Sequence, residues 1–298
     1  MRTDEIKRER PITWFIRLSG YSSILFVSLI LLFLVREGLP ALGDVPLGSL
    51  LGTRWYPIES MYGIWPLLSG TLIVTIGALL IALPLGVGTA VFMAEIAPPS
   101  VNNVLKPIIE ILAGLPSVVL GFIGIQLLVP NLRRILDLLT GLSAFTGAVL
   151  LAMIALPTIV SIAEDALNTV PPSYRHASLA LGATRWQTIW GVTLPAARSG
   201  VLTAVMLGIG RAIGETMAVM MVTGNAPVLP SGLNALFLPA RTMTATIASE
   251  MGEVANGSPH YHVLFFIGMV LFLLSLGVNI LASSVSLRGR KRSERMLS

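Results

Sequence analysis

Residues 66–94, PLLSGTLIVTIGALLIALPLGVGTAVFMA, form a long apolar run that contains no charged side chain. A helix needs about 20 mainly apolar residues to cross the hydrocarbon core of a bilayer, because each residue advances it by only about 1.5 Å. A lone strand could not satisfy its backbone hydrogen-bonding groups in lipid. The run therefore predicts a membrane-spanning helix and excludes a soluble globular domain.

Outside this run, the first stretch long enough to span is residues 18–35, which follow a basic segment as in a signal peptide. The apolar region of a signal peptide is usually about 7–15 residues long, and this stretch is longer. No cleavage pattern follows it, so we interpret it as a retained helix, with cleavage as the alternative. Only 12% of the residues are charged, against about 25% in soluble domains. The sequence predicts an all-α integral membrane protein with six transmembrane helices, the remaining four at 107–129, 144–164, 199–222 and 261–286.

The distribution of lysine and arginine predicts the orientation of these helices, because cytoplasmic segments are enriched in both. With a cytoplasmic N-terminus, fourteen of the twenty basic residues fall inside and five outside, while Arg211 lies within a helix. Both termini are therefore predicted to be cytoplasmic. The outside residues are Arg36, Arg54, Arg133, Arg134 and Arg241; the inside ones are Arg2, Lys7, Arg8, Arg10, Arg17, Lys106, Arg175, Arg185, Arg198, Arg288, Arg290, Lys291, Arg292 and Arg295.

Several classes of site are excluded by residues that the sequence lacks. There is no cysteine, and His176, His260 and His262 are too scattered to indicate a metal site. No G-x-x-x-x-G-K-[ST] sequence is present, so a P-loop for ATP is excluded, and no catalytic residue is predicted. A pI near 10.0 does not indicate a nucleic-acid partner, because the basic residues lie in short segments between apolar runs.

The segment between the fourth and fifth runs, residues 168–197, reads NTVPPSYRHASLALGATRWQTIWGVTLPAA. Ser173 is a candidate N-cap for a short helix, and Gly182 can adopt the left-handed conformation that ends it. Thr184 and Gln187 have the spacing of a capping box, which begins a second helix. The predicted structure is two short helices joined by a glycine turn at the membrane surface, although this spacing also fits an ordinary loop.

Trp186, Ile189 and Trp190 are spaced to lie on one side of the second helix, and Pro195 suits the first turn of the next span. The segment resembles the EAA signature of ABC importer permeases, with His176 where that family often has Glu. The resemblance implies that residues 173–192 form coupling helices that dock on a separate ATPase. It assigns coupling to His176, Ala177, Gly182, Ala183, Thr184, Trp186, Ile189, Leu194 and Pro195.

Arg211 lies near the middle of the fifth apolar run, where a charge is costly and indicates function. Glu215 follows at i+4 and could form an ion pair with it, while Gly210 and Gly214 form a small-xxx-small pattern that allows close helix packing. One interpretation is a structural pair that fixes helix packing. The other is a translocation path in which Arg211 attracts an anion, because a guanidinium offers paired donors to oxyanions.

Three stretches, ILAGLPSVVLG at 111–121, ALGATRWQTI at 180–189 and GRAIGETMA at 210–218, resemble the phosphate-specific ABC importer permeases. The N-terminal region and residues 248–260 are similar to the PstC type rather than the PstA type. The resemblance implies the type I ABC importer permease architecture in the plasma (inner) membrane, with Arg211, Glu215 and Ser117 along the substrate path. The partners that it implies are a homologous PstA-type permease, an ATPase dimer that holds ATP and Mg, and an extracytoplasmic phosphate-binding protein.

The chain is expected to divide into three parts and to bind no cofactor itself. Residues 1–64 comprise a cytoplasmic segment, the first helix and an outer loop; residues 65–287 form the core permease domain, and residues 288–298 a basic cytoplasmic tail. Two alternatives remain at this stage: a proton-coupled secondary anion carrier, which could also place Arg and Glu in the membrane, and a non-transporting membrane anchor or signalling subunit.

Overall fold

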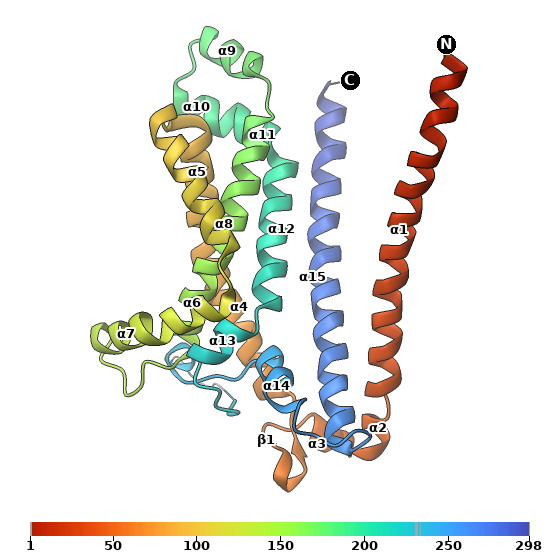
Figure 1. Ribbon diagram of the computed structural model, residues 1–298. Coiled ribbons are helices and arrows are strands. Elements are labelled where there is room, and N and C mark those ends of the chain that lie inside the picture. The colour runs from red at the N-terminus through yellow and green to blue at the C-terminus, as the bar shows by residue number, and fades with distance from the viewer. Residues whose placement is uncertain (1, 230–231, 233, 298) are drawn as a thin grey trace.

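The computed structural model describes residues 2–229, 232 and 234–297, which are mostly helical (Figure 1). One two-stranded antiparallel hairpin, β1–β2, pairs Trp55 with Tyr62. The elements in chain order are α1 (Arg2–Gly38), α2 (Ala41–Asp44), α3 (Leu47–Leu50), β1 (Trp55–Tyr56), η1 (Pro57–Glu59), β2 (Met61–Tyr62), α4 (Trp65–Val91), η2 (Phe92–Ile96), α5 (Pro99–Gly114), α6 (Ser117–Ile123), η3 (Gly124–Leu128), α7 (Val129–Ile135), α8 (Ala144–Asn168), α9 (Pro172–Ala180), α10 (Arg185–Thr188), η4 (Ile189–Thr193), α11 (Leu194–Ala196), α12 (Arg198–Gly214), α13 (Met217–Val222), η5 (Ala235–Phe237), α14 (Met243–Glu250) and α15 (Pro259–Leu297).

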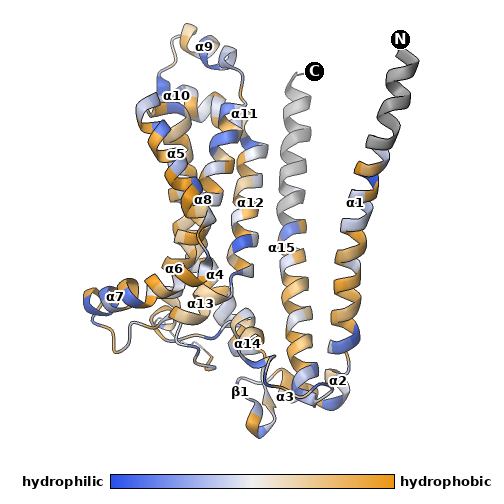
Figure 2. Ribbon diagram, in the orientation of Figure 1, coloured by the Kyte–Doolittle hydropathy of each residue, from blue (hydrophilic) through white to orange (hydrophobic). Residues whose placement is uncertain are grey.

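Five helical runs within the described residues are long and apolar enough to cross a membrane, and a bent pair, residues 185–196 with 198–214, brings the number to six. Hydrophobic residues dominate the lower part of α1 and of α15 in this view (Figure 2). Between residues 13 and 30 nearly all side chains of α1 are exposed within this chain; Phe26, for example, is 63% exposed. Since these side chains have no core of their own to enter, lipid or a partner must cover them. The prediction of an all-helical, multi-pass membrane protein is confirmed.

Two of the predicted spans are broken rather than continuous. Leu115 has an extended backbone (ψ 134°), which ends α5, because the residue before a proline is disfavoured in the α region. After Pro116 the chain turns, so that α6 and α7 run across the bundle (Figure 1). Glu215 is extended in the same way (ψ 131°) and separates α12 from α13. The spans predicted over 107–129 and 199–222 are therefore each divided between separate helices.

Helix α8 forms the centre of the main bundle, with α4 and α12 packed against it. Ile159 of α8 is fully buried and lies between Gly86 of α4 and Gly208 of α12, where an added Cβ atom would approach it within 3 Å. Glycine at both positions lets the backbones come close, as is common between membrane helices. This packing fixes the positions of the helices that carry the polar residues described below.

A small outer lobe lies at the end of the molecule opposite α9 and α10, built from α2, α3, the hairpin, α14 and the start of α15 (Figure 1). Trp55 and Tyr62 are buried in this lobe. The Trp55 indole donates a hydrogen bond to Glu250 Oε1 at 3.0 Å, and Arg241 and His260 also contact this carboxylate. Burial and the charge of Glu250 raise the pKa of Tyr62 above its ordinary value.

The boundaries predicted for three domains remain a prediction. Helix α4 begins at Trp65, close to the first boundary. Helix α15 continues through residue 288 to Leu297, so no change of secondary structure marks the second boundary. Residues before and after the first boundary share one apolar cluster, in which Leu50 and Leu67 are both buried.

Candidate functional site

Arg211 lies in the last turn of α12 and makes hydrogen bonds to two other helices. Its Nη1 donates to Thr158 Oγ1 of α8 at 2.8 Å, and its Nη2 donates to the carbonyl oxygen of Ala113 in α5 at 3.2 Å. Both acceptors are neutral. In the part of the chain that the structure describes, no carboxylate forms an ion pair with Arg211. Its positive charge is therefore held in place but not neutralised.

Glu215 does not pair with Arg211 in the described part of the chain, so the ion pair that their i, i+4 spacing made possible is not formed. The helix ends at Gly214, which removes the i, i+4 geometry on which the pair depended. Glu215 Oε1 instead accepts hydrogen bonds from the backbone N–H groups of Thr216 at 3.1 Å and Ala218 at 3.2 Å. A carboxylate in this place stabilises the start of α13, because the first N–H groups of a helix lack partners within it.

The two broken helices meet each other near Arg211. Ser117 is the first residue of α6, four positions after Ala113, whose carbonyl oxygen Arg211 binds. Gly121 of α6 lies against α13, where an added Cβ would meet Ala218 and Met221. The structure thus brings Ser117, Arg211 and Glu215 to the neighbourhood of two paired helix breaks.

Gly210 and Gly214 do not pack against another helix of this chain. Apart from the neighbouring backbone of α12 itself, no atom of the described residues lies within 4 Å of a Cβ added at either glycine. This face of α12 is therefore open within the described chain, and close packing of another helix on it stays a prediction.

The segment between α8 and α12 has the predicted helix–turn–helix form. Gly182 adopts a left-handed backbone (φ 86°) between α9 and α10. Thr184 Oγ1 accepts from the N–H of Gln187 at 3.3 Å, and Gln187 Oε1 accepts from the N–H of Thr184 at 2.8 Å, which confirms the capping box. Ser173 is not an N-cap, because α9 already begins at Pro172.

The aromatic residues of this segment face away from the protein. Trp186 and Trp190 are 60% and 64% exposed, whereas Ile189 is buried in an apolar cluster with Leu167. The prediction that all three side chains lie on one side is wrong, because the π-helical turn η4 interrupts the spacing. Pro195 lies in α11, before the 73° bend into α12. Of the remaining coupling candidates, Ala183 and Leu194 are partly exposed, and His176, Ala177, Gly182 and Thr184 are exposed.

Two basic residues near this segment form ion pairs that were not predicted. Arg175 binds Glu95 at 2.6 Å. Lys106 binds both Glu164 and Asp165, at 2.8 and 2.9 Å. All three pairs join residues far apart in the chain, so no local spacing signals them.

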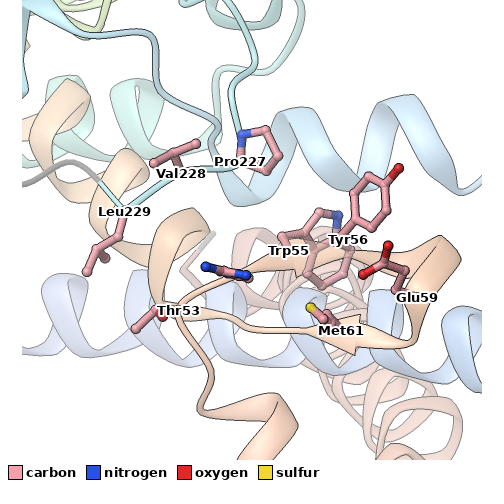
Figure 3. A pocket seen from close by; sticks show the side chains of 9 residues that line it. Thr53, Trp55, Tyr56, Glu59, Met61, Pro227, Val228 and Leu229 are labelled. Atoms are coloured by element: carbon pink, nitrogen blue, oxygen red, sulfur yellow. The ribbon is translucent and has the colours of Figure 1, made fainter.

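An open cavity of about 580 Å³ lies in the outer lobe between the hairpin and residues 227–229 (Figure 3). Figure 3 shows Trp55, Tyr56 and Met61 on the hairpin side and Val228 facing them from the loop. A backbone bridge between Arg54 and Val228 joins the two walls. This cavity is at the opposite end of the molecule from α10 (Figure 1).

The sequence model described as "Binding-protein-dependent transport system inner membrane component" matches residues 83–291, which is most of the chain. The chain belongs to this family. Family membership makes it a transport permease subunit, embedded in the membrane by several helices.

Curated relatives of this permease agree with the assignment. The chain is 45% identical to the "Probable ABC transporter permease protein YqgH" of Bacillus subtilis over 251 residues, covering 83% of this chain and 80% of that protein. It is 31% identical to the "Phosphate transport system permease protein PstC" of Xylella fastidiosa, covering 94% and 92%, and 36% identical to the PstC protein of Haemophilus influenzae, covering 78% of each.

Solved structures share the fold of this permease. A chain of a bacterial alginate ABC transporter aligns with a TM-score of 0.60 at 15% identity, covering 96% of both chains. A chain of the inward-facing MetNI methionine ABC transporter aligns with a TM-score of 0.56 at 21% identity, covering 76% of this chain and 94% of that one. At such identities the likeness concerns the fold alone, which is that of an ABC importer permease.

Proposed function

We propose that this chain is a PstC-type permease subunit of an ATP-driven importer of inorganic phosphate. The observation that carries the proposal is Arg211, a guanidinium at two paired helix breaks whose hydrogen-bond acceptors are both neutral. A guanidinium suits an oxyanion because its planar fork offers parallel donors. The phosphate transport permeases among its relatives support the same substrate.

The substrate path in this proposal runs past Arg211, Ser117 and Glu215. Thr158 and the Ala113 carbonyl hold the guanidinium in position, and phosphate competes with these neutral acceptors for its donors. Glu215 acts differently from Arg211: it stabilises the start of α13 and so maintains the break beside the path.

Residues 173–192 are proposed to couple this chain to an ATPase dimer that binds ATP and Mg. The exposed apolar side chains of Leu181, Trp186 and Trp190 suit a protein contact, because they would otherwise lie in water. Hydrolysis belongs to the ATPase, and its closure moves this segment. Alternating access to the Arg211 region follows from that movement.

We place the remaining partners at the two ends of the molecule and at the open face of α12. The start of α1 and the end of α15 lie at the same end as α9 (Figure 1), so both termini are proposed to be cytoplasmic in the plasma (inner) membrane. The extracytoplasmic phosphate-binding protein then meets the cavity beside Val228. The open face at Gly210 and Gly214 is proposed to receive the homologous PstA-type permease.

The test is uptake of labelled phosphate into vesicles that hold this chain with its partner subunits, with and without ATP. We expect ATP-dependent uptake by the parent complex and its loss in Arg211→Ala. Arg134→Ala is the matched control, because Arg134 belongs to α7 and lies away from the helix breaks. A verified complex without ATP-dependent uptake would contradict the proposal, and uptake that needs no ATPase would indicate a secondary carrier.

Arg211→Lys separates charge from geometry at the same position. Lysine keeps the positive charge but is a point charge without a fixed fork of donors, so we expect phosphate uptake to fall by about tenfold, the scale of one charged hydrogen bond. The measurement is the concentration dependence of uptake beside the parent. Unchanged kinetics would show that paired donors are not used.

A further inference from the structure

Arg175 of α9 joins the coupling segment, residues 173–192, to the cytoplasmic ends of two other helices. Its Nε and Nη2 donate to Glu95 Oε1 at 2.8 and 2.6 Å. Its Nη1 donates to the carbonyl oxygen of Val170 at 2.8 Å, and Nη2 also donates to that of Leu167 at 3.0 Å. The two side chains are only 21% and 8% exposed. One guanidinium therefore holds α9 to the end of α8 and to Glu95.

Glu95 belongs to η2, the π-helical turn that ends α4. The coupling segment is continuous in sequence with α8 and α12, so its movement reaches those two helices through the backbone. Helix α4 has no such connection. Among the described residues, the bond between Arg175 and Glu95 is the sole ion pair or side-chain hydrogen bond that joins α9 to α4 and η2.

Apolar contact also brings this region together, since Val91 and Ile189 belong to one buried cluster. Such contact is non-directional and permits sliding. A buried, charge-assisted pair resists separation, because removing either partner leaves an uncompensated charge. Glu95 also lies on a π-helical turn, a local irregularity that often occurs at functional sites. Movement of Arg175 would therefore be transmitted to α4 at that turn.

We propose that the pair of Arg175 and Glu95, here called the Arg175–Glu95 link, transmits movement of the coupling segment to α4. Three helices then respond to the ATPase: α8 and α12 through the chain, and α4 through the link. Both side chains are positioning residues, distant from the substrate path at Arg211. This inference rests on the proposed function.

The direct test is Glu95→Ala in the assembled complex, with ATP hydrolysis and labelled phosphate uptake measured together. This change leaves the bonds from Arg175 to Val170 and Leu167, so α9 stays attached to α8. We expect phosphate imported per ATP hydrolysed to fall by about fivefold or more, the scale of a coupling interaction, while the ATPase still co-purifies. Glu37→Ala is the matched control, because the ion pair between Glu37 and Arg36 is 3.6 Å long and the Arg36 side chain is exposed.

A chemical rescue separates transmission from simple loss of structure. The chain contains no cysteine, so Glu95→Cys with Arg175→Cys places two unique thiols in this subunit. We expect a short, reducible bifunctional thiol reagent to restore import per ATP, reduction to abolish it again, and each single cysteine variant to remain uncoupled.

Two results would overturn the link while leaving the proposed function intact. One is parent-level import per ATP in Glu95→Ala; the other is a cross-linked cysteine pair that hydrolyses ATP without recovering import. Failure of the parent complex to import phosphate would instead refute the proposed function itself. If Glu95→Ala does not assemble, the cross-linked pair decides between the outcomes.

Discussion

At the scale of single residues, the proposed function depends on the orientation of the Arg211 guanidinium. Thr158 accepts one of its hydrogen bonds, and valine has nearly the same shape without the hydroxyl. We expect Thr158→Val to reduce phosphate uptake by about two- to tenfold, because one hydrogen bond contributes roughly 1 kcal/mol, with assembly unchanged. Thr158→Ser keeps the hydroxyl and serves as the control. The check is uptake at several phosphate concentrations, and parent-like kinetics in Thr158→Val would show that this bond does not orient Arg211.

At the scale of elements, the turn between α9 and α10 depends on Gly182, whose φ of 86° favours glycine. Proline has a fixed φ near −65° and cannot adopt this conformation. We expect Gly182→Pro to separate the two short helices and abolish co-purification of the ATPase, while membrane insertion persists because the long apolar helices are unchanged. Gly88→Ala is the control, since Gly88 is helical with open space around it. Normal co-purification of Gly182→Pro would contradict the coupling assignment.

At the scale of the whole molecule, Glu250 connects separate parts of the chain in the outer lobe. Its carboxylate accepts a hydrogen bond from Trp55 and contacts Arg241 and His260. Glu250→Ala leaves Arg241 without its carboxylate, and breaking a buried pair costs about 3–5 kcal/mol. Partial exposure lowers this cost, so we expect roughly 2 kcal/mol and a lower apparent Tm in thermal unfolding. Glu59→Ala, at an exposed turn in the same lobe, should leave Tm unchanged. An unaltered Tm in Glu250→Ala would show that the network does not stabilise the lobe.

The sequence by itself determined the features that depend on composition or on residues within one helical turn of each other. Long apolar runs predict membrane helices because lipid admits only backbones that satisfy their own hydrogen bonds. Thr184 and Gln187 form the predicted capping box, and Gly182 the predicted turn, because both depend on local backbone geometry. Pro116 also indicates an irregularity in the helix, but its position alone does not determine whether the helix bends or ends there.

Tertiary structure decided which charged groups meet. The backbone is extended at Glu215, so this residue is not one helical turn above Arg211. Arg211 instead donates its hydrogen bonds to residues of α5 and α8. Arg175 binds Glu95, 80 positions away in the chain, because packing of α8 against α4 brings the ends of these helices beside α9 together. Such pairs form only after helices dock. Their energy depends on burial and geometry that no short stretch of sequence encodes.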